Sequence, residues 1–230
     1  MRINPVKNSS DFWAAVAITA GAAGVIATSV FYGLAPPQAA LPMPHPIMLQ
    51  AVHAAAAAAP LMKTAGTIGI ISDVTLAVGA MVLMADRTAS GEALERLGWA
   101  AVAVSAIVFI AVDAMAGYVL AEIAVLPDNQ AAFAGFKRLF DVLFILGTLA
   151  FGTASLAIFW NERRGGARIL GTVGLLTGLL ATLASSAYFV GIDLAQPLGL
   201  SIAAGSVLFV LLGVRIARRA SGVMRSQSAP

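Results

Sequence analysis

The sequence predicts an all-α, polytopic membrane protein with six transmembrane helices in one bundle, formed by a single domain over residues 1–230. Two observations of composition support this class: 60% of the residues are apolar and 11% are charged. A soluble domain needs about 25% charged residues to cover its surface. A disordered chain would combine low hydrophobicity with high net charge, whereas the net charge here is +3. The third observation is a set of long apolar runs.

Six apolar runs are long enough to cross a bilayer as helices, since about 20 residues span the hydrocarbon core. In order, they cover Phe12–Leu34, Leu61–Ala85, Leu97–Ala124, Leu139–Trp160, Ile169–Ile192 and Leu198–Val214. Strands of a transmembrane barrel would instead be segments of about 10 residues with alternating polarity. The first run exceeds the roughly 7–15 apolar residues of a secretory signal, so we expect it to be retained as a span.

The charges between these runs predict the orientation of the bundle. Three cations, Lys63, Lys137 and Arg138, fall on one side, and the other 11 of the 14 fall on the opposite side. The larger set is Arg2, Lys7, Arg87, Arg96, Arg163, Arg164, Arg168, Arg215, Arg218, Arg219 and Arg225. Loops rich in Lys and Arg stay in the cytoplasm, so we expect both termini to be cytoplasmic in a cell inner membrane.

The connection over residues 35–60 is the one long external segment. It opens with five prolines between Pro36 and Pro46, which enforce extended or turning backbone. The following Ile47–Ala59 ends in six consecutive alanines, and alanine is the best helix former. We expect a short interfacial helix here, serving either as a cap over the bundle or as a lid over a binding cavity.

The second and fourth spans share a pattern in which glycine follows aspartate by six residues. The pairs are Asp73 with Gly79 and Asp141 with Gly147. This spacing is compatible with a parallel duplication of a two-helix hairpin, an arrangement known in transporters. Spans rich in alanine, leucine and glycine also resemble each other by chance, so both interpretations stay open.

Three aspartates lie within the predicted spans, where a charge costs roughly 2.5–3.5 kcal/mol on insertion scales. Asp73 and Asp113 belong to consecutive helices at similar depth, and Asp141 lies nearer the outer boundary. Helical spacing places Asp73 on a stripe of small residues with Gly66, Gly69, Ala77 and Ala80. Small residues permit close helix approach, so we expect these carboxyl groups to face the interior of the bundle.

Outer-side residues complete the candidate site. Lys63, Lys137 and Arg138 are placed to neutralise the aspartates, with Lys137 and Arg138 four and three positions before Asp141. Tyr118 also falls in the outer half of its helix. Two interpretations fit this set: a satisfied polar cluster that fixes helix packing, or a proton-titrating or cation-binding site that opens outward.

Several kinds of chemistry lack the residues they require. There is no cysteine, and His45 and His53 lie in the external connection, so thiolate metal sites and transmembrane haem are disfavoured. No zinc-protease, phosphate-loop or serine-hydrolase motif occurs. Four C-terminal arginines without interleaved aromatics do not indicate nucleic-acid binding. We therefore expect no catalytic residues, cofactor or metal, and an enzyme is the least favoured class.

The segment Phe136–Ala184 reads FKRLFDVLFILGTLAFGTASLAIFWNERRGGARILGTVGLLTGLLATLA. It resembles the later helices of an uncharacterised family of bacterial six-helix integral membrane proteins, a domain of unknown function. The resemblance covers the fourth and fifth spans and the basic turn between them. It implies the six-helix architecture and carries no activity.

The functional hypothesis is a small transporter-like or ligand-binding membrane protein with an outward-facing polar site around Asp73, Asp113 and Asp141. Its partners would be the lipid bilayer and a small molecule or ion. The alternative is a non-catalytic accessory or scaffold subunit, partnered by another membrane protein or by further copies of itself, whose polar residues only hold helices together.

Overall fold

The computed structural model describes residues 5–87 and 93–227, with side chains for residues 9–86 and 93–222, and its regular secondary structure there is all helical. Six helices are long and apolar enough to cross a membrane, which confirms the predicted fold class. They are α1 (Pro5–Leu34), α3 (Met48–Arg87), α4 (Ala93–Ala114), α6 (Gln130–Arg164), α7 (Arg168–Phe189) and α8 (Ala195–Gln227). Shorter segments are α2 (Pro37–Ala40), the π-helical η1 (Met115–Leu120) and α5 (Ala121–Ile123).

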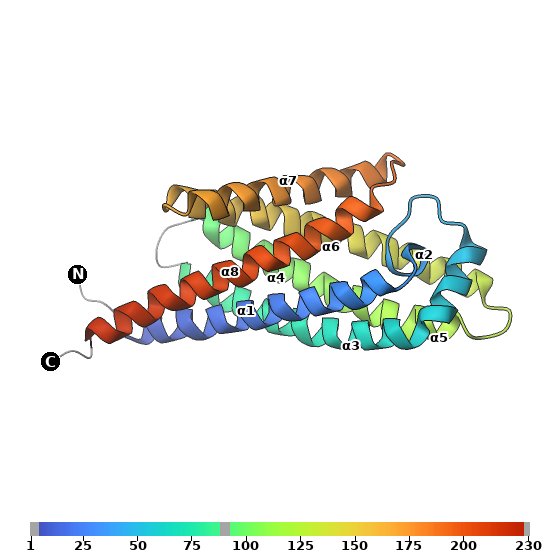
Figure 1. The fold of residues 1–230 in the computed structure, drawn as a ribbon, viewed down its shortest axis with the longest axis horizontal. Helices are drawn as coiled ribbons and strands as arrows, with labels where there is room; N and C mark the ends of the chain where they lie inside the picture. Colours follow the sequence, from blue (N-terminus) through green and yellow to red (C-terminus); the bar gives the residue numbers. More distant parts are fainter. Residues whose placement is uncertain (1–4, 88–92, 228–230) are drawn as a thin grey trace.

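The long helices form a ring in which each packs against the next in chain order, and α8 returns to α1. They run roughly along the long axis of the molecule, and both ends of the chain lie at the same end of the bundle (Figure 1). We call this the terminal end and the opposite one the α2 end. An even number of spans requires this arrangement of the termini.

Most helices extend beyond the apolar runs that predicted them. For example, α6 begins at Gln130 and continues to Arg164, past both ends of the Leu139–Trp160 run. Hydropathy marks where a helix enters lipid, whereas its hydrogen-bond ladder continues into the polar boundary region. The fifth span is the exception at its end, because α7 stops at Phe189 and Gly191 follows with a positive φ of 79°.

The predicted short interfacial helix is not a separate element. The predicted break between it and the second span, at Pro60, was wrong. Residues from Met48 onward belong to one 40-residue helix, α3, that contains Pro60. The first turns of α3 cross the α2 end at a steep angle to the remainder (Figure 1). Proline within a helix removes one hydrogen bond and clashes with the preceding turn, which kinks the helix without necessarily ending it.

Two clusters of buried side chains hold the bundle together. Toward the terminal end, Phe209 of α8 stacks edge-on or tilted against Trp99, Phe151 and Phe159, with ring centroids 5.4–6.2 Å apart. Toward the α2 end, the cluster includes Phe133, Phe140 and Phe144 from α6. Aromatic contacts of this geometry add to the energy of burial, so α6 and α8 organise both halves of the core.

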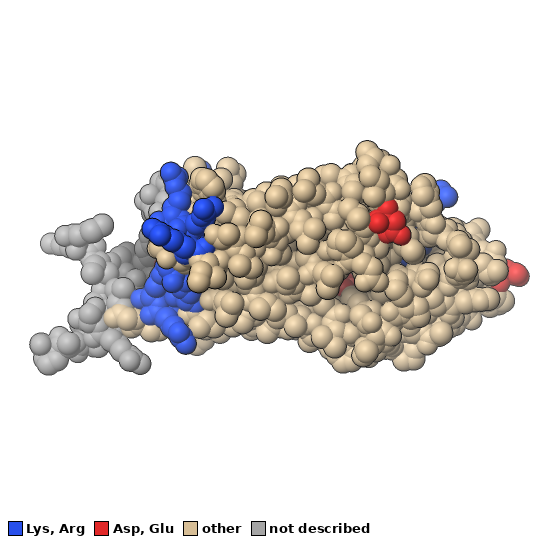
Figure 2. Space-filling view, turned by 45° about the horizontal axis from the view of Figure 1, so that its top comes forward, with Lys and Arg blue, Asp and Glu red and all other residues tan. Residues whose placement is uncertain are grey.

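The outer surface has the pattern expected in lipid. Large apolar side chains point outward along the helices, including Ile71, Val104 and Leu176, which are 64%, 54% and 63% exposed. Figure 2 shows a broad band without charges, and Lys and Arg side chains gathered beside the terminal end. The side chains of Arg2, Lys7, Arg87 and Arg225, which belong to the predicted inner set, lie outside the described residues.

Candidate functional site

The candidate site lies where α3 packs closely against the third span, which consists of α4, η1 and α5. A Cβ added at Gly66 would lie 2.6 Å from the Asp113 carbonyl oxygen and 3.0 Å from the Gly117 Cα atom. The two helix backbones therefore touch at this level, and only glycine on both helices permits it. Asp73 and Asp113 each sit near this contact, so the backbone approach brings their side chains together. The predicted stripe of small residues on α3 is confirmed.

The carboxyl groups of Asp73 and Asp113, which the sequence places at similar depth, lie in hydrogen-bonding contact. Both side chains are buried, with 4% of each residue exposed. A Cβ at Gly69 would lie 1.8 Å from Oδ2 of Asp113, so the absence of a side chain there makes room for this carboxyl group. Two carboxylates in a medium of low dielectric repel each other, and a shared proton relieves that repulsion.

Tyr32 of α1 completes this group. Its hydroxyl donates a hydrogen bond of 2.9 Å to Oδ1 of Asp113. Three helices thus contribute one polar side chain each to a single cluster, which we call the carboxyl cluster: Tyr32, Asp73 and Asp113. Sequence reasoning missed Tyr32, because periodicity does not show which helix lies beside which. A hydroxyl near the outer end of a span otherwise made of small and apolar residues was the available signal.

The carboxyl cluster lines a cavity of about 270 Å³. Most of the wall is apolar, with rings of Phe109, Phe140 and Phe144, and Gln196 adds a polar group from the first turn of α8. The exposed lining residues Gly33, Pro37 and Leu200 place the mouth between α1, α2 and α8. Figure 2 shows acidic atoms recessed below the uncharged surface on the face that it displays. The carboxyl groups therefore line a chamber whose exposed lining residues lie in the half of the bundle nearer the α2 end.

A π-helical segment begins two residues after Asp113, over Met115–Leu120. Such segments contain one wider turn, and they often occur at functional sites. Here the wider turn lies between Asp113, which faces the cavity, and the outer continuation α5. Gly117 within it contacts the backbone of Met62 on α3, with an added Cβ 3.0 Å from the Met62 carbonyl oxygen.

A second polar group holds the external connection. Lys137 and Asp141 form an ion pair on α6, as the spacing of four predicted, and their side chains are 0% and 1% exposed. Lys137 Nζ also donates to the Leu41 carbonyl oxygen at 3.0 Å. Asp141 accepts a hydrogen bond from the backbone of Met43. We call this arrangement the clasp, because it ties residues 41–43, directly after α2, to α6.

The clasp adjoins the cavity without belonging to the carboxyl cluster. Leu41, whose carbonyl oxygen Lys137 binds, lines the cavity together with Pro37 and Ala40 of α2. Lys137 Nζ also lies 4.9 Å from the ring centroid of Phe140, another lining residue. The external connection therefore covers one side of the chamber, and a buried ion pair fixes its position.

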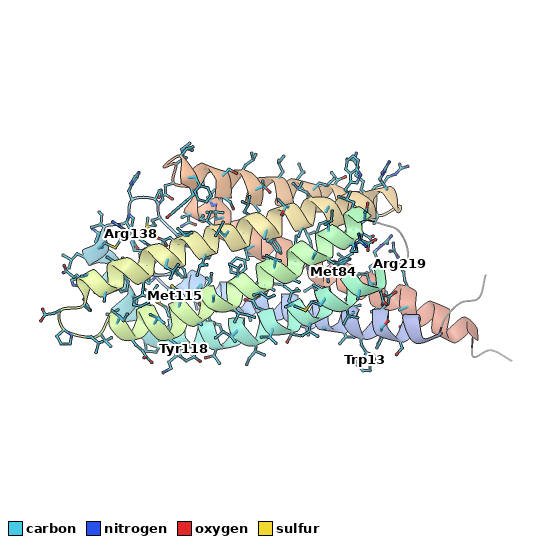
Figure 3. The ribbon with its side chains drawn as sticks, turned by 180° about the vertical axis from the view of Figure 1, so that it is seen from behind. Trp13, Met84, Met115, Tyr118, Arg138 and Arg219 are labelled. Atoms are coloured by element: carbon cyan, nitrogen blue, oxygen red, sulfur yellow. The ribbon has the colours of Figure 1, made fainter. Side chains whose placement is uncertain are left out.

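Three predicted site residues lie elsewhere. Lys63 is exposed, pairs with Glu122 at 3.6 Å and lies 5.6 Å from the ring centroid of Tyr118. The Tyr118 hydroxyl is 2.6 Å from Oγ1 of Thr67 on the same outer face. Arg138 is exposed, and among the described residues no ion pair joins it to Asp141. Figure 3 shows Tyr118 and Arg138 pointing outward from different helices.

The reason for this separation is helical geometry. Lys63 lies on an exposed side of α3, away from the stripe that carries Asp73. Arg138 follows the buried Lys137 by one position, which turns its side chain by about 100° around the helix. The expectation that Lys63 and Arg138 would neutralise the aspartates was therefore wrong in geometry, and Lys137 alone meets one of them.

No family model, curated protein or solved structure matches this chain. The resemblance of Phe136–Ala184 to a six-helix family consequently stays a prediction. Within the described residues, no group of three or more histidine, aspartate or glutamate side chains is arranged to hold a metal ion. The chemistry of the site therefore has to be inferred from the carboxyl cluster and its cavity.

Proposed function

We propose that this protein is a transporter-like membrane protein that binds a small cation carrying apolar groups, in exchange for a proton held by the carboxyl cluster. One observation carries the proposal: two carboxyl groups from different helices meet at the wall of a mostly apolar cavity. This arrangement combines a group that can hold or release a proton with a wall that can accept apolar atoms.

The charge of the cavity favours a cation over an anion. Asp73 and Asp113 line the cavity, whereas Lys137 is engaged with Asp141 and the backbone of Leu41. A cation entering the chamber can displace the shared proton and pair with the carboxylates, because either partner relieves the repulsion between them. Ionisable groups inside a membrane bundle commonly mark such ion or proton pathways.

The size and lining of the cavity favour a small ligand. Its volume of about 270 Å³ is just under the range of roughly 300–1,000 Å³ typical of small-molecule sites. The three phenylalanine rings offer surfaces on which a positive charge or an apolar group can rest. The connection around α2 would then act as a lid, which the clasp holds against the chamber.

We further propose that the chamber opens outward from a cell inner membrane. Figure 2 shows Lys and Arg side chains gathered beside the terminal end, and Figure 3 shows Arg219, one of the predicted inner set, at that end. Cytoplasmic loops carry the excess of Lys and Arg, so this end would face the cytoplasm and the cavity mouth the other side. Substrate would then approach from outside.

The experiment uses the full-length protein reconstituted in lipid vesicles that contain a pH-sensitive dye. Tetraethylammonium serves as the apolar cation, sodium as the inorganic cation and benzenesulfonate, which stays ionised, as the anion. We expect a proton flux driven by a tetraethylammonium gradient, and we expect Asp73→Asn to abolish it while the protein stays folded. Benzenesulfonate should produce no such flux.

Asp86→Asn is the matched control, because Asp86 lies on the same helix and accepts a hydrogen bond from Ser10 at 2.8 Å near the terminal end. It should keep the flux. A chain that carries no gradient-driven proton flux with either cation would contradict the proposal. Failure of Asp73→Asn to accumulate in the membrane, with no flux in the parent protein, would support the alternative of an accessory or scaffold subunit.

A further inference from the structure

The turn between α6 and α7 carries a group of side chains that the proposed function does not use. An open groove of about 430 Å³ is lined there by Trp160, Arg163, Arg164 and Arg168. All three arginines are exposed. The groove lies at the terminal end, far from the cavity mouth, so a ligand bound here would be distinct from the transported one.

The positive charge of this groove is not neutralised by the nearest acid. Glu162 precedes Arg163 in the chain, but its carboxylate accepts hydrogen bonds from Arg215 at 2.9 Å and Arg219 at 3.2 Å on α8. Of the residues that the structure describes, none forms an ion pair with Arg163, Arg164 or Arg168. Glu162 is therefore used to join α6 to α8, and three guanidinium groups remain for an external anion.

Apolar side chains directly below the groove indicate what kind of anion fits. Trp160 is 43% exposed, and Cζ of Arg164 lies 5.7 Å from its ring centroid. Ile169, next to Arg168, is 83% exposed, and Val173 and Leu176 continue the exposed apolar surface along α7. A soluble anion would not contact this apolar surface. A phospholipid would lay its acyl chains along the surface and place its phosphate among the arginines.

We infer that this groove binds the headgroup of an anionic phospholipid. Arginine binds phosphate oxygens through its planar pair of donors, and indole rings favour the boundary between headgroups and acyl chains. Basic pockets between membrane helices on the cytoplasmic side recognise lipid headgroups by this combination. The lipid would fill the space between the ends of α6 and α7 and hold their turn at the membrane surface.

The test measures lipid binding to the purified full-length protein in neutral detergent by native mass spectrometry. The parent protein is titrated with short-chain phosphatidylglycerol and with phosphatidylcholine, and we expect preference for the former. The double variant Arg164→Gln, Arg168→Gln should bind phosphatidylglycerol roughly 25-fold more weakly, from about fivefold for each arginine. The double variant Arg96→Gln, Arg218→Gln removes the same charge outside the groove and should change binding less than about threefold.

An equal loss in both double variants would overturn the inference, because it would show a diffuse basic ring instead of a site. Equal binding of the two lipids by the parent protein would overturn it as well. Competition by inorganic phosphate at the lipid's own concentration would assign the groove to a soluble anion. If the groove variant does not fold, Arg168→Gln alone, expected about fivefold weaker, is compared with Arg96→Gln.

Discussion

The hydroxyl of Tyr32 and the missing side chain of Gly69 both determine where the Asp113 carboxyl group lies. One donates a hydrogen bond of 2.9 Å to it, and the other leaves the space that it occupies. Neither residue carries a charge, yet each acts on the group at the centre of the proposed site. Substitutions at these two positions therefore test the cluster without changing its formal charge.

Tyr32→Phe removes one hydrogen bond and almost no volume. We expect the free energy of unfolding to fall by about 1–3 kcal/mol, because the buried Asp113 oxygen loses a donor. Unfolding of the purified protein in mixed micelles measures this. Tyr118→Phe is the comparison, since its hydroxyl contacts Thr67 on an exposed face and should matter by less than about 0.5 kcal/mol. If both variants lost the same free energy of unfolding, the hydrogen bond from Tyr32 to Asp113 would contribute no more than the exposed contact of Tyr118.

Gly69→Ala places a methyl group where the Asp113 carboxyl group now lies, at 1.8 Å from Oδ2. We expect the bundle to lose about 1–3 kcal/mol of stability through overpacking, and tetraethylammonium-driven flux to be lost. Gly135→Ala on α6 is the control, because nothing lies within 4 Å of its added Cβ. That variant should be neutral, or stabilised by up to about 1 kcal/mol through better helix propensity. Similar behaviour of the two alanine variants would contradict this account.

At the scale of elements, the site depends on the bend in α3, on the π-helical η1 and on the short helix α2. Bending of α3 at its proline lets the first turns cover the bundle end, and η1 widens a turn beside Asp113. The third segment, α2, covers the cavity and is followed by the residues that the clasp holds. The clasp, a buried ion pair on α6, therefore fixes the connection that we propose as a lid.

The lid can be released by replacing the clasp with apolar side chains. Lys137→Met alone should cost about 3–5 kcal/mol, because it leaves Asp141 buried without its cation, whereas Lys137→Met with Asp141→Leu should restore much of that loss. In the double variant, we expect a cysteine at Ser29 in the cavity wall to react several-fold faster with a membrane-impermeant maleimide.

The chain has no cysteine of its own, so each such label reports one position. The matched reference is the same Ser29→Cys substitution with the clasp intact. Unchanged labelling in the double variant would show that residues 41–43 stay in place without the ion pair, and the clasp would then have no role in closing the chamber.

At the scale of the whole molecule, the features predictable from the sequence were those that a lipid environment requires: long apolar helices, with their polar side chains turned inward. The lengths of the apolar runs predicted all six spans, and helical spacing predicted buried positions for Asp73, Asp113 and Asp141. The neighbours of a helix were not predictable, because they depend on which backbones approach closely, and so Tyr32 was missed and Lys63 was misassigned. The continuity of α3 was missed because proline permits either an end or a kink.

Orientation is the property of the whole molecule that remains to be tested. Green fluorescent protein fused after Pro230 should fluoresce, because it folds in the cytoplasm, and alkaline phosphatase fused there should be inactive. Insertion of the phosphatase between Asp128 and Asn129, before α6, should give the opposite result. A fluorescent fusion at the second position would invert the bundle and would place the cavity mouth on the cytoplasmic side.

The placement of the clasp has a consequence for biogenesis. Lys137 and Asp141 lie one turn apart on the same helix, so α6 can enter the bilayer with its two charges already neutralising each other. Asp73 and Asp113 are both acidic and belong to successive spans, so during insertion neither can neutralise the other and only a proton can. The hairpin of α3 and α4 therefore bears an insertion cost that α6 avoids, and we expect the Tyr32 hydroxyl to reach Asp113 only after α1, synthesised earlier, packs against this hairpin.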